Sequence, residues 1–596
     1  MNATLMNATP ATLMRDSLAG MSFATLVATV AEAPAGTSEV ELYQSWIETN
    51  AGRSPQLFAG WFNLGAAFSR QGDRGRAIAA YGNALALKPD FHAAAVNLGL
   101  SLEAEGDTDA ALESWQRALQ PDAARIMLLN HRGRLLERLG RLDEAEAALR
   151  QSLAADPHQP DVIQHWAHIR QRMCRWPVLT DLPGLPATEM AHSCGPLAML
   201  ALTDDVAMQS EVAGRWIARK TQPVAQRLSP EAGYRHDRIR IGYLSSDFCR
   251  HAMSFLIAEL FERHDRARFE VFGYCASPDD GSPVRQRVLG AFDHVRIVRD
   301  LPDTEAAAAI RADEIDILID LNGLTAGSRL QVLRHRPAPV QATYLGFVGP
   351  VPLPELDYLF CDDFVVPAEQ AAAYLPPPLA IGPAYQANDS RRVAGVPLSR
   401  AEAGLPPDRF VLCCFANHYK ITQPMFAAWL AILRRAPDAV LWLATDNAWS
   451  PDALRAAATD AGIDPGRLIF AERCDPAIYL SRLRLADLFL DTFPYNGGTV
   501  ASDALRVGLP LLTLCGRSFA SRMAARLLDR VGTADGITHS LDAYIARAAL
   551  LASDPPAYAA FRARFSADAW SATLGDTAAF TLAFEATLAR IRLRPG

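Results

Sequence analysis

The stretch DLFLDTFPYNGGTVASDALRVG, residues 487–508, joins an apolar run to a glycine turn and then to an amphipathic run. The apolar run predicts a buried strand, and the residues from Thr499 onward predict a helix. Asn496, Gly497 and Gly498 fill the turn between them. Backbone N–H groups at a helix start are unpaired and partly positive, and glycines let an anion come close to them. The stretch therefore predicts a strand–turn–helix unit that is either a phosphate-binding loop or a plain tight turn.

Short β-rich runs alternate with helical stretches on both sides of this unit. The first series occupies 238–245, 268–275, 314–323 and 340–347, and the second begins at 409 with RFVLCCFA, followed by AVLWLAT, RLIFAE, DLFLDTF and LPLLTLCG. This alternation predicts βαβ units and two consecutive doubly wound parallel sheets, with the linker between them inside 383–399. Ligands of such sheets bind at the carboxyl ends of the strands.

A period of 34 residues runs through the first quarter of the chain. Small residues recur at Gly65, Gly99 and Gly133, where they let paired helices approach closely. Each unit has two helical stretches joined by a polar turn, centred on Gly72, Gly106 or Gly140. The units resemble the tetratricopeptide repeat, whose stacked helix pairs form a groove that binds another chain. Residues 161–176 resemble a closing helix after the third repeat.

Composition narrows the class of protein. The chain has 596 residues and a net charge of −8, without the basic footprint of a nucleic-acid binder. No uncharged apolar run is long enough to cross a bilayer, and the first residues lack the basic segment of a signal peptide. The nine cysteines are scattered, which favours buried thiols over disulfides or a zinc site. We expect a cytoplasmic protein.

Long motifs in both α/β halves resemble the protein O-GlcNAc transferase and SPINDLY-like family. Residues 413–443 and 485–528 are similar to one part of its catalytic region, and 245–282 and 320–349 to the other. The resemblance extends from the repeats to near residue 535. It implies a GT-B fold and an inverting transfer of a sugar from a nucleotide donor to a protein side chain. It also implies that the reaction needs no metal.

The resemblance assigns roles to individual residues. Lys420, in NHYKI, matches the lysine that contacts the diphosphate, and Asn417 stands where the family often has a glutamine near the phosphates. Thr499 matches a phosphate-loop position and Asp503 a ribose-binding position. His251, in SDFCRHAMSFL, matches the active-site histidine, which takes a proton from the acceptor hydroxyl or orients it.

Departures from the family leave the donor open. Members that use UDP-GlcNAc often have His-Thr-Thr where this chain has Gly498, Thr499 and Val500. The donor is therefore UDP-GlcNAc by family default, a GDP-deoxysugar, or a CMP-nonulosonic acid. No cofactor is expected beyond this co-substrate, and no metal site, because the single D-x-D, Asp107 to Asp109, falls in a repeat turn.

These observations predict an α plus α/β protein: an N-terminal TPR α-solenoid followed by a GT-B region of two Rossmann-like domains. The predicted parts are a mobile tail at 1–37, repeats at 38–180, a helical linker at 181–233, a first catalytic lobe at 234–395, and a second, nucleotide-sugar-binding lobe with closing helices at 396–596. The predicted function is O-glycosylation of Ser or Thr in an acceptor protein that the repeats recruit. The Ala, Arg and Pro content suits a bacterial source, with flagellin as acceptor. Glycosylation of Asn and a non-catalytic TPR scaffold remain alternatives, and joint retention of His251, Lys420, Thr499 and Asp503 speaks against the scaffold.

Overall fold

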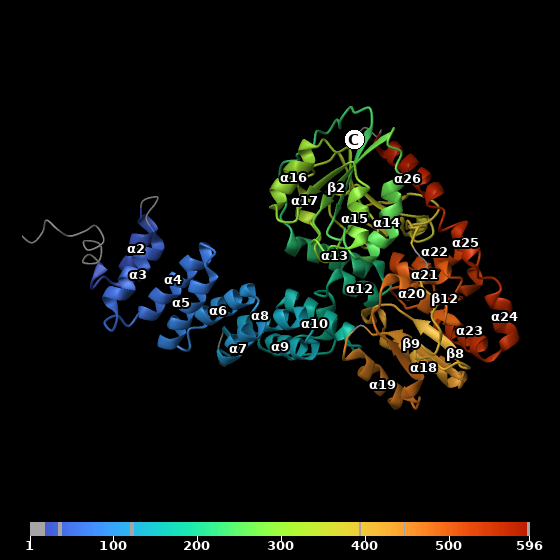
Figure 1. The fold of residues 1–596 in the computed structure, drawn as a ribbon, viewed down its shortest axis with the longest axis horizontal. Helices are drawn as coiled ribbons and strands as arrows, with labels where there is room; N and C mark the ends of the chain where they lie inside the picture. Colours follow the sequence, from blue (N-terminus) through green and yellow to red (C-terminus); the bar gives the residue numbers. More distant parts are fainter. Residues whose placement is uncertain (1–17, 34–37, 120–123, 393–394, 446, 593–596) are drawn as a thin grey trace, which may run out of the picture. The chain divides into compact units, whose positions relative to one another are not determined.

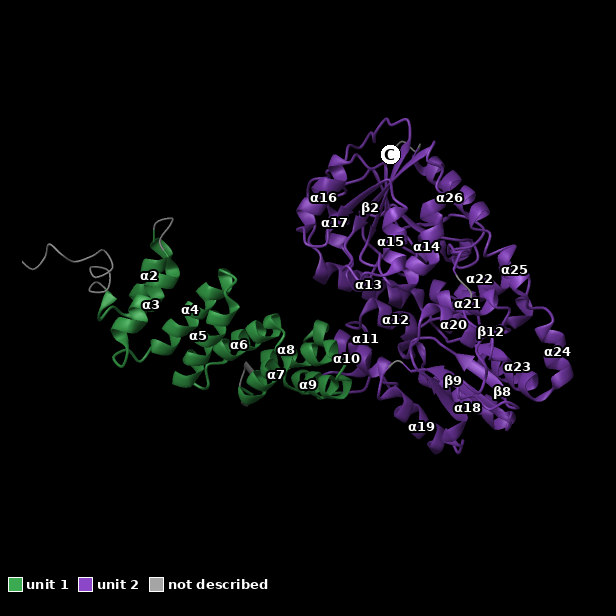
Figure 2. Cartoon of the chain, in the orientation of Figure 1, with its two compact units in different colours: residues 1–162, 182–184 green, residues 163–181, 185–596 purple. Residues whose placement is uncertain are grey.

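The computed structural model describes residues 18–33, 38–119, 124–392, 395–445 and 447–592. The chain divides into two compact units, one of residues 1–162 with 182–184 and one of residues 163–181 with 185–596 (Figure 2). The elements of the first unit's described part, α2 to α9, are all helices, and the second unit contains two parallel sheets. This is the predicted fold class. Within the described ranges, every helix is too short or too polar to cross a membrane.

The helical unit is a series of antiparallel helix pairs, coloured blue to teal in Figure 1. Its helices are α2 (Phe23–Glu32), α3 (Glu39–Asn50), α4 (Leu57–Arg70), α5 (Arg74–Leu87), α6 (His92–Glu105), α7 (Thr108–Arg117), α8 (Ala124–Arg138) and α9 (Leu142–Ala155). Helix α10 (Pro160–Arg172) follows and crosses the boundary between the units. Helices α4 and α5, α6 and α7, and α8 and α9 form the three predicted repeats.

The repeated glycines let the paired helices approach closely, as the period of 34 predicts. A Cβ on Gly99 would lie 2.2 Å from the indole of Trp115, sixteen residues further along the chain. The same spacing joins the other two glycines to their neighbours, Gly65 to Tyr81 and Gly133 to Leu149. A larger side chain would push the paired helices apart. The turns also agree, because Gly72, Gly106 and Gly140 have φ of 79°, 88° and 74°, the left-handed region that favours glycine.

Two boundaries of the repeat domain need correction. Residues 18–32 were predicted as part of a mobile tail, yet Leu18 and Leu26 are buried in one cluster with Trp46 of the first helices. The indole N–H of Trp46 donates a hydrogen bond to the carbonyl of Met21 at 2.9 Å. At the other end, residues 163–181 pack as part of the sheet-containing unit.

The first lobe of the second unit has seven parallel strands in the order β3-β2-β1-β4-β5-β6-β7. The strands are β1 (Ile239–Ser245), β2 (Phe269–Cys275), β3 (His294–Ile297), β4 (Ile317–Asp320), β5 (Val340–Thr343), β6 (Tyr358–Cys361) and β7 (Pro378–Ala380). The intervening helices are α14 (Ala252–Arg263), α15 (Pro283–Gly290), α16 (Asp303–Ala312), α17 (Leu330–Arg334) and the 3₁₀ helix η1 (Ala368–Ala373). Helices α14 and α15 lie on one side of the sheet, and α16 and α17 on the other (Figure 1). On β4, Ile317 and Ile319 point to the first side and Leu318 to the second, as period-2 alternation requires.

The second lobe has six parallel strands in the order β10-β9-β8-β11-β12-β13. The strands are β8 (Phe410–Cys414), β9 (Ala439–Ala444), β10 (Leu468–Ala471), β11 (Leu488–Leu490), β12 (Leu511–Leu514) and β13 (Ile537–Thr538). Its helices are α18 (Gln423–Arg435), α19 (Ser450–Asp460), α20 (Pro476–Leu483), α21 (Thr499–Arg506), α22 (Met523–Arg530), α23 (Leu541–Ser553), α24 (Pro555–Arg562) and α25 (Ala567–Ser571), with 3₁₀ turns η2 (His418–Lys420), η3 (Pro465–Arg467), η4 (Phe519–Ser521) and η5 (Ala534–Gly536). Two doubly wound sheets in succession confirm the GT-B prediction.

Segments at both ends of the lobes depart from the predicted parts. Helix α26 (Thr577–Arg592) falls in the range assigned to the second lobe, but Phe580 and Phe584 pack in the core of the first. Helices α11 (Ala187–Ala191), α12 (Pro196–Leu202) and α13 (Val206–Lys220) lie in the predicted linker. Leu200 and Ile217 of this segment nevertheless share a buried cluster with both lobes, so the segment is part of the core of the second unit.

Polar contacts join the two lobes. Asp362 of the first lobe is 1% exposed and accepts a hydrogen bond from Arg526 of the second at 3.2 Å. The backbone N–H of Phe519 donates to the hydroxyl of Tyr374 at 2.8 Å. Asp204, between α12 and α13, accepts from the backbone N–H of Ser518 at 2.9 Å.

Candidate active site

The predicted site residues lie at the points where the strand order reverses. In the first sheet this point is between β1 and β4, and in the second between β8 and β11. His251 follows β1 and precedes α14, whereas Asn417 and Lys420 follow β8. The glycine turn follows β11 and precedes α21. Open parallel sheets bind ligands at such reversals, so each lobe presents its candidates at the place the fold favours.

The turn between β11 and α21 is fixed by one buried carboxylate. Asp491, 1% exposed, accepts from the backbone N–H of Gly497 at 2.7 Å and from the hydroxyl of Thr513 at 2.7 Å. Burial raises the pKa of Asp491 to about 6, against the hydrogen bonds and the charge of Lys420 that favour its ionised form. Asn496 is fully buried and its amide donates to the carbonyl of Thr492 at 2.8 Å. The turn is therefore rigid before any ligand binds.

The start of α21 is open to an anion. Gly498 occupies the N-cap position, and across the described ranges no side chain caps this helix. The first N–H groups of a helix have no partner within it, so those from Thr499 onward are available to a ligand. Thr499 itself is half-buried. The strand, turn and helix predicted from the sequence are all present.

Lys420 lies directly over this turn. Its ammonium group donates to the backbone carbonyl of Asn496 at 3.0 Å and lies 3.5 Å from the ring centroid of Tyr495. Removal from water lowers the pKa of Lys420 to about 8, although the carboxylate of Asp491 acts in the opposite direction. The structure thus brings Lys420, Gly497 and the helix start together. Asn417 is exposed, and its carbonyl accepts from the backbone N–H of Lys420 at 3.0 Å.

Asp503 is held by a partner that the sequence did not reveal. The resemblance assigns it to a ribose-binding position. Helix α21 starts at Thr499, so Asp503 lies beyond the first turn and is 3% exposed. Its carboxylate pairs with the guanidinium of Arg392 at 2.5 Å, and burial raises its pKa in spite of that cation. A ribose contact would have to share the carboxylate with Arg392.

His251 lies in the first lobe, after β1, at the point where the strand order of the first sheet reverses. Its side chain is 49% exposed, and its Nδ1 accepts from the backbone N–H of Met253 at 3.3 Å, which caps α14. Asp247 Oδ2 lies 3.6 Å from the same nitrogen and accepts from the amide of Asn322 at 2.8 Å. Burial is the main cause that raises the pKa of Asp247. The neighbouring Arg250 forms an ion pair with Asp475 of the second lobe at 2.6 Å.

Comparison with known proteins identifies the family. The sequence profile of glycosyl transferase family 41 matches residues 221–384 and 383–584, which is more than half of the chain. The chain belongs to glycosyl transferase family 41. Tetratricopeptide repeat profiles match residues 61–91 and 126–169.

Relatives of this family 41 chain include a probable UDP-N-acetylglucosamine–peptide N-acetylglucosaminyltransferase, SEC, of Arabidopsis thaliana. It is 33% identical over 409 residues, covering 67% of this chain and 42% of that protein. The enzyme of that type from Caenorhabditis elegans is 27% identical, covering 59% and 40%, and SPINDLY of Petunia hybrida is 29% identical, covering 58% and 38%. The chain thus spans about two fifths of the length of these curated relatives.

A solved structure confirms the fold. A variant of the Thermobaculum terrenum O-GlcNAc transferase superposes with a TM-score of 0.64 and 24% identity. The match covers 90% of this chain and 97% of that one.

Sequence reasoning missed the carboxylate that holds the turn in place in each lobe of this family 41 chain. Asp320 ends β4 as Asp491 follows β11, and it accepts from the N–H of Gly323 at 2.7 Å and the hydroxyl of Thr343 at 3.1 Å. Burial raises the pKa of Asp320 to about 6. The signal was present, because each half of the sequence has an Asp after an apolar run and then Asn-Gly.

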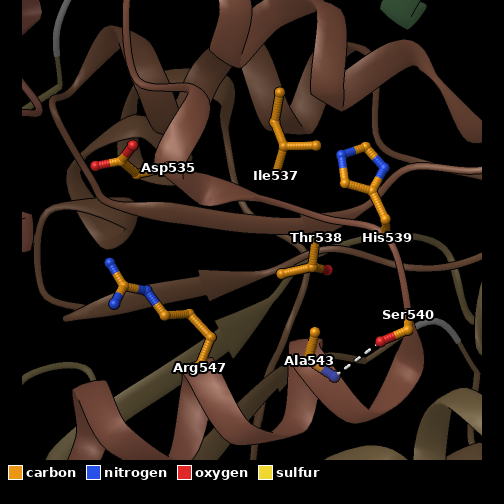
Figure 3. A pocket seen from close by; sticks show the side chains of 7 residues that line it. All are labelled: Asp535, Ile537, Thr538, His539, Ser540, Ala543 and Arg547. Carbon is orange, nitrogen blue, oxygen red and sulfur yellow. Dashed lines mark hydrogen bonds between the residues drawn. The ribbon is translucent and has the colours of Figure 1, made fainter.

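A separate recess of about 470 Å³ lies near the outer strand β13 of the second sheet (Figure 3). Asp535, Ile537, Thr538, His539, Ser540, Ala543 and Arg547 line it. The hydroxyl of Ser540 caps α23 by accepting from the N–H of Ala543, and Asp535 pairs with Arg564. None of the predicted site residues lines this recess, so the candidate active site is at the strand reversals.

Proposed function

We propose that this chain is an inverting, metal-independent glycosyltransferase that transfers a sugar from a nucleotide sugar to Ser or Thr of an acceptor protein. UDP-GlcNAc is the default donor, because the names of the relatives specify it. GDP-deoxysugars and CMP-nonulosonic acids remain candidates because of the glycine at position 498. The proposal places the enzyme in the cytoplasm.

The observation that carries the proposal is the cation above an uncapped helix. Lys420 lies over the Asn496–Gly498 turn, and the N–H groups at the start of α21 are open beside it. A leaving diphosphate needs stabilisation of its developing negative charge, and a preorganised ammonium with backbone donors supplies it. The hydrogen bond from the Gly497 N–H to Asp491 holds the turn, and therefore these donors, in place between turnovers.

His251 is assigned to the acceptor hydroxyl, as an orienting group. The N–H of Met253 occupies Nδ1, which leaves the proton of the neutral ring on Nε2. That N–H can donate to the acceptor oxygen and direct its lone pair toward the anomeric carbon. The oxygen then forms the new C–O bond as the bond to the diphosphate breaks, with inversion, and the hydroxyl proton leaves to solvent or to a diphosphate oxygen.

The repeats are assigned to recruitment of the acceptor. Three helix pairs in register form the type of solenoid that binds protein segments. Flagellin is the acceptor we would test first, because a bacterial source supplies it in abundance.

Two measurements test this function. Calorimetric titration with UDP-GlcNAc, GDP-fucose and a CMP-nonulosonic acid should detect binding of one donor. Intact-mass analysis of flagellin co-expressed with the enzyme should show the mass increment of that sugar, and peptide mapping should place it on Ser or Thr. Sugar on Asn would favour the N-linked alternative, and absence of binding and transfer for all donors would favour the scaffold.

A further inference from the structure

Residues 385–388 lie against the start of α21, although the sequence predicts only a linker there. A Cβ placed on Gly498 would lie 3.4 Å from the hydroxyl oxygen of Tyr385 and 3.3 Å from Oε1 of Gln386. Both polar atoms therefore face the backbone of the turn that the proposed function assigns to the diphosphate.

The hydroxyl of Tyr385 is buried without a partner. The residue is 2% exposed, and the described part of the chain offers its oxygen no hydrogen bond. A buried hydroxyl without a partner is costly, so this one, which faces the turn, is available to a ligand atom that reaches Gly498. The ring packs edge-on against Phe519 at 5.5 Å, so the hydroxyl is held in position. Burial raises the pKa of Tyr385 well above its ordinary value, and the phenol stays protonated as a donor.

The side-chain amide of Gln386 is oriented by Asn388. Its Nε2 donates to Oδ1 of Asn388 at 3.0 Å. The hydroxyl of Ser502, on α21, donates to the same oxygen at 2.6 Å and fixes the Asn388 amide. The carbonyl of Gln386 is then turned toward Gly498. The turn is faced by one O–H group that can donate and one carbonyl that can only accept.

We propose that Tyr385 and Gln386 bind a hydroxyl group of the sugar carried by the donor, in the space beside Gly498 that opens when the terminal methyl of Met523, 2.7 Å from a Cβ at position 498, turns away. A sugar hydroxyl both donates and accepts, which matches this pair. A phosphate oxygen only accepts, and the carbonyl of Gln386 would repel it. The inference rests on the proposed function, because α21 must hold the diphosphate for the attached sugar to reach Gly498.

Tyr385→Phe, which removes only the hydroxyl, tests the contact. Calorimetry would compare UDP with UDP-GlcNAc, and GDP with GDP-fucose, using the pair that the wild-type protein binds. We expect the affinity for the nucleotide sugar to fall about tenfold, the usual effect of one lost hydrogen bond. Affinity for the bare nucleoside diphosphate should not change, which also shows that the variant is folded. Gln386→Met should give the same pattern.

Tyr234→Phe is the matched control. Its hydroxyl also has no partner among the described residues, and it precedes β1 in the first lobe, away from the turn. Both affinities should stay at the wild-type value. Equal affinity of wild type and Tyr385→Phe for the nucleotide sugar would overturn the inference, as would an equal loss for the bare nucleotide. Failure of the wild-type protein to bind any of these nucleotides or a CMP-nonulosonic acid would instead overturn the proposed function.

Discussion

Lys420 shows how one side chain can couple folding, ligand binding and pH. Its ammonium is retained over the turn in spite of partial desolvation, which lowers its pKa to about 8. Selection for stability alone would favour a neutral side chain at position 420. The arrangement is reasonable if the charge serves a bound anion.

Lys420→Ala should reduce transfer by roughly a hundredfold or more, because the diphosphate loses its cation.

In the wild-type protein, nucleotide affinity should fall as pH rises through about 8, where Lys420 loses its proton. The unfolded chain keeps this proton up to about 10.4, so without ligand the free energy of unfolding should rise with pH between these two values. Calorimetry and urea unfolding from pH 7 to 10 would measure both trends.

Lys420→Arg is the control for the pH dependence, because arginine remains charged throughout this range. Its nucleotide affinity should be flat across pH 8. A wild-type profile that is equally flat would contradict the assignment of the proton to Lys420.

Asp503→Ala should destabilise the protein. The substitution leaves Arg392 buried, at 10% side-chain exposure, without its carboxylate. Breaking a buried ion pair in this way costs about 3–5 kcal/mol. Asp475→Ala breaks an exposed pair with Arg250 and should change stability by less than about 1 kcal/mol. Thermal melts of both variants would show the difference, and equal melting temperatures would refute it.

At the scale of single elements, the βα unit around residue 498 is more crowded than its glycines suggest. The nearest atom to a Cβ on Gly498 would be the terminal methyl of Met523, at 2.7 Å. A methionine end can shift, but Tyr385 and Gln386 lie directly behind it on the same side. The turn is therefore open to a ligand at its backbone, and its side-chain position opens only when the Met523 methyl moves.

Gly498→Ala should keep its melting temperature within a few degrees, since only the Met523 methyl needs to move. Gly498→Trp should lower the melting temperature as well as nucleotide affinity, because the indole has to displace Met523 and Tyr385. The double variant Gly498→Trp with Met523→Ala should recover part of the lost stability. Differential scanning calorimetry of the three proteins would decide, and an unchanged melting temperature for Gly498→Trp would show that the space is larger than the contacts imply.

The elements that sequence predicts well are those with local signals. The period of 34 located Gly65, Gly99 and Gly133, and the strand–turn–helix pattern located Gly498, because each depends on neighbours in sequence. Contacts between distant segments were not predictable in this way. The pairing of Arg392 with Asp503 spans 111 residues. The packing of α26 on the first lobe brings the last helix of the second unit against strands that lie more than 200 positions earlier in the sequence. Those contacts depend on tertiary packing, which one sequence does not reveal.

At the scale of the whole molecule, the division into units gives a better truncation than the sequence did. Removal of residues 1–180 would delete residues 163–180 from the sheet-containing unit. Ala167 and Cys174 of that segment are buried in its clusters. A chain that starts at residue 160 keeps the whole of α10.

The chain that starts at residue 160 should bind nucleotide as the full chain does but modify an intact acceptor poorly when the acceptor is limiting. A short acceptor peptide should remain a substrate, because it needs only the catalytic unit. The chain that starts at residue 181 should melt at lower temperature or fail to fold. Donor calorimetry and mass spectrometry of the acceptor would test these outcomes. Full modification of the intact acceptor by the chain without the repeats would show that the repeats are not needed to recruit it.

The polar contacts between the lobes have a thermodynamic consequence. Asp362 with Arg526, and Tyr374 with Phe519, are buried contacts that already join the lobes. If the donor of the proposed function binds where the lobes meet, lobes that are already joined spare it the entropy of ordering them, and little additional apolar surface is buried on binding. The heat-capacity change on binding should then be small. Encounter rates should resemble those of rigid partners, and turnover would be governed by the bond-breaking step or by release of the spent nucleotide.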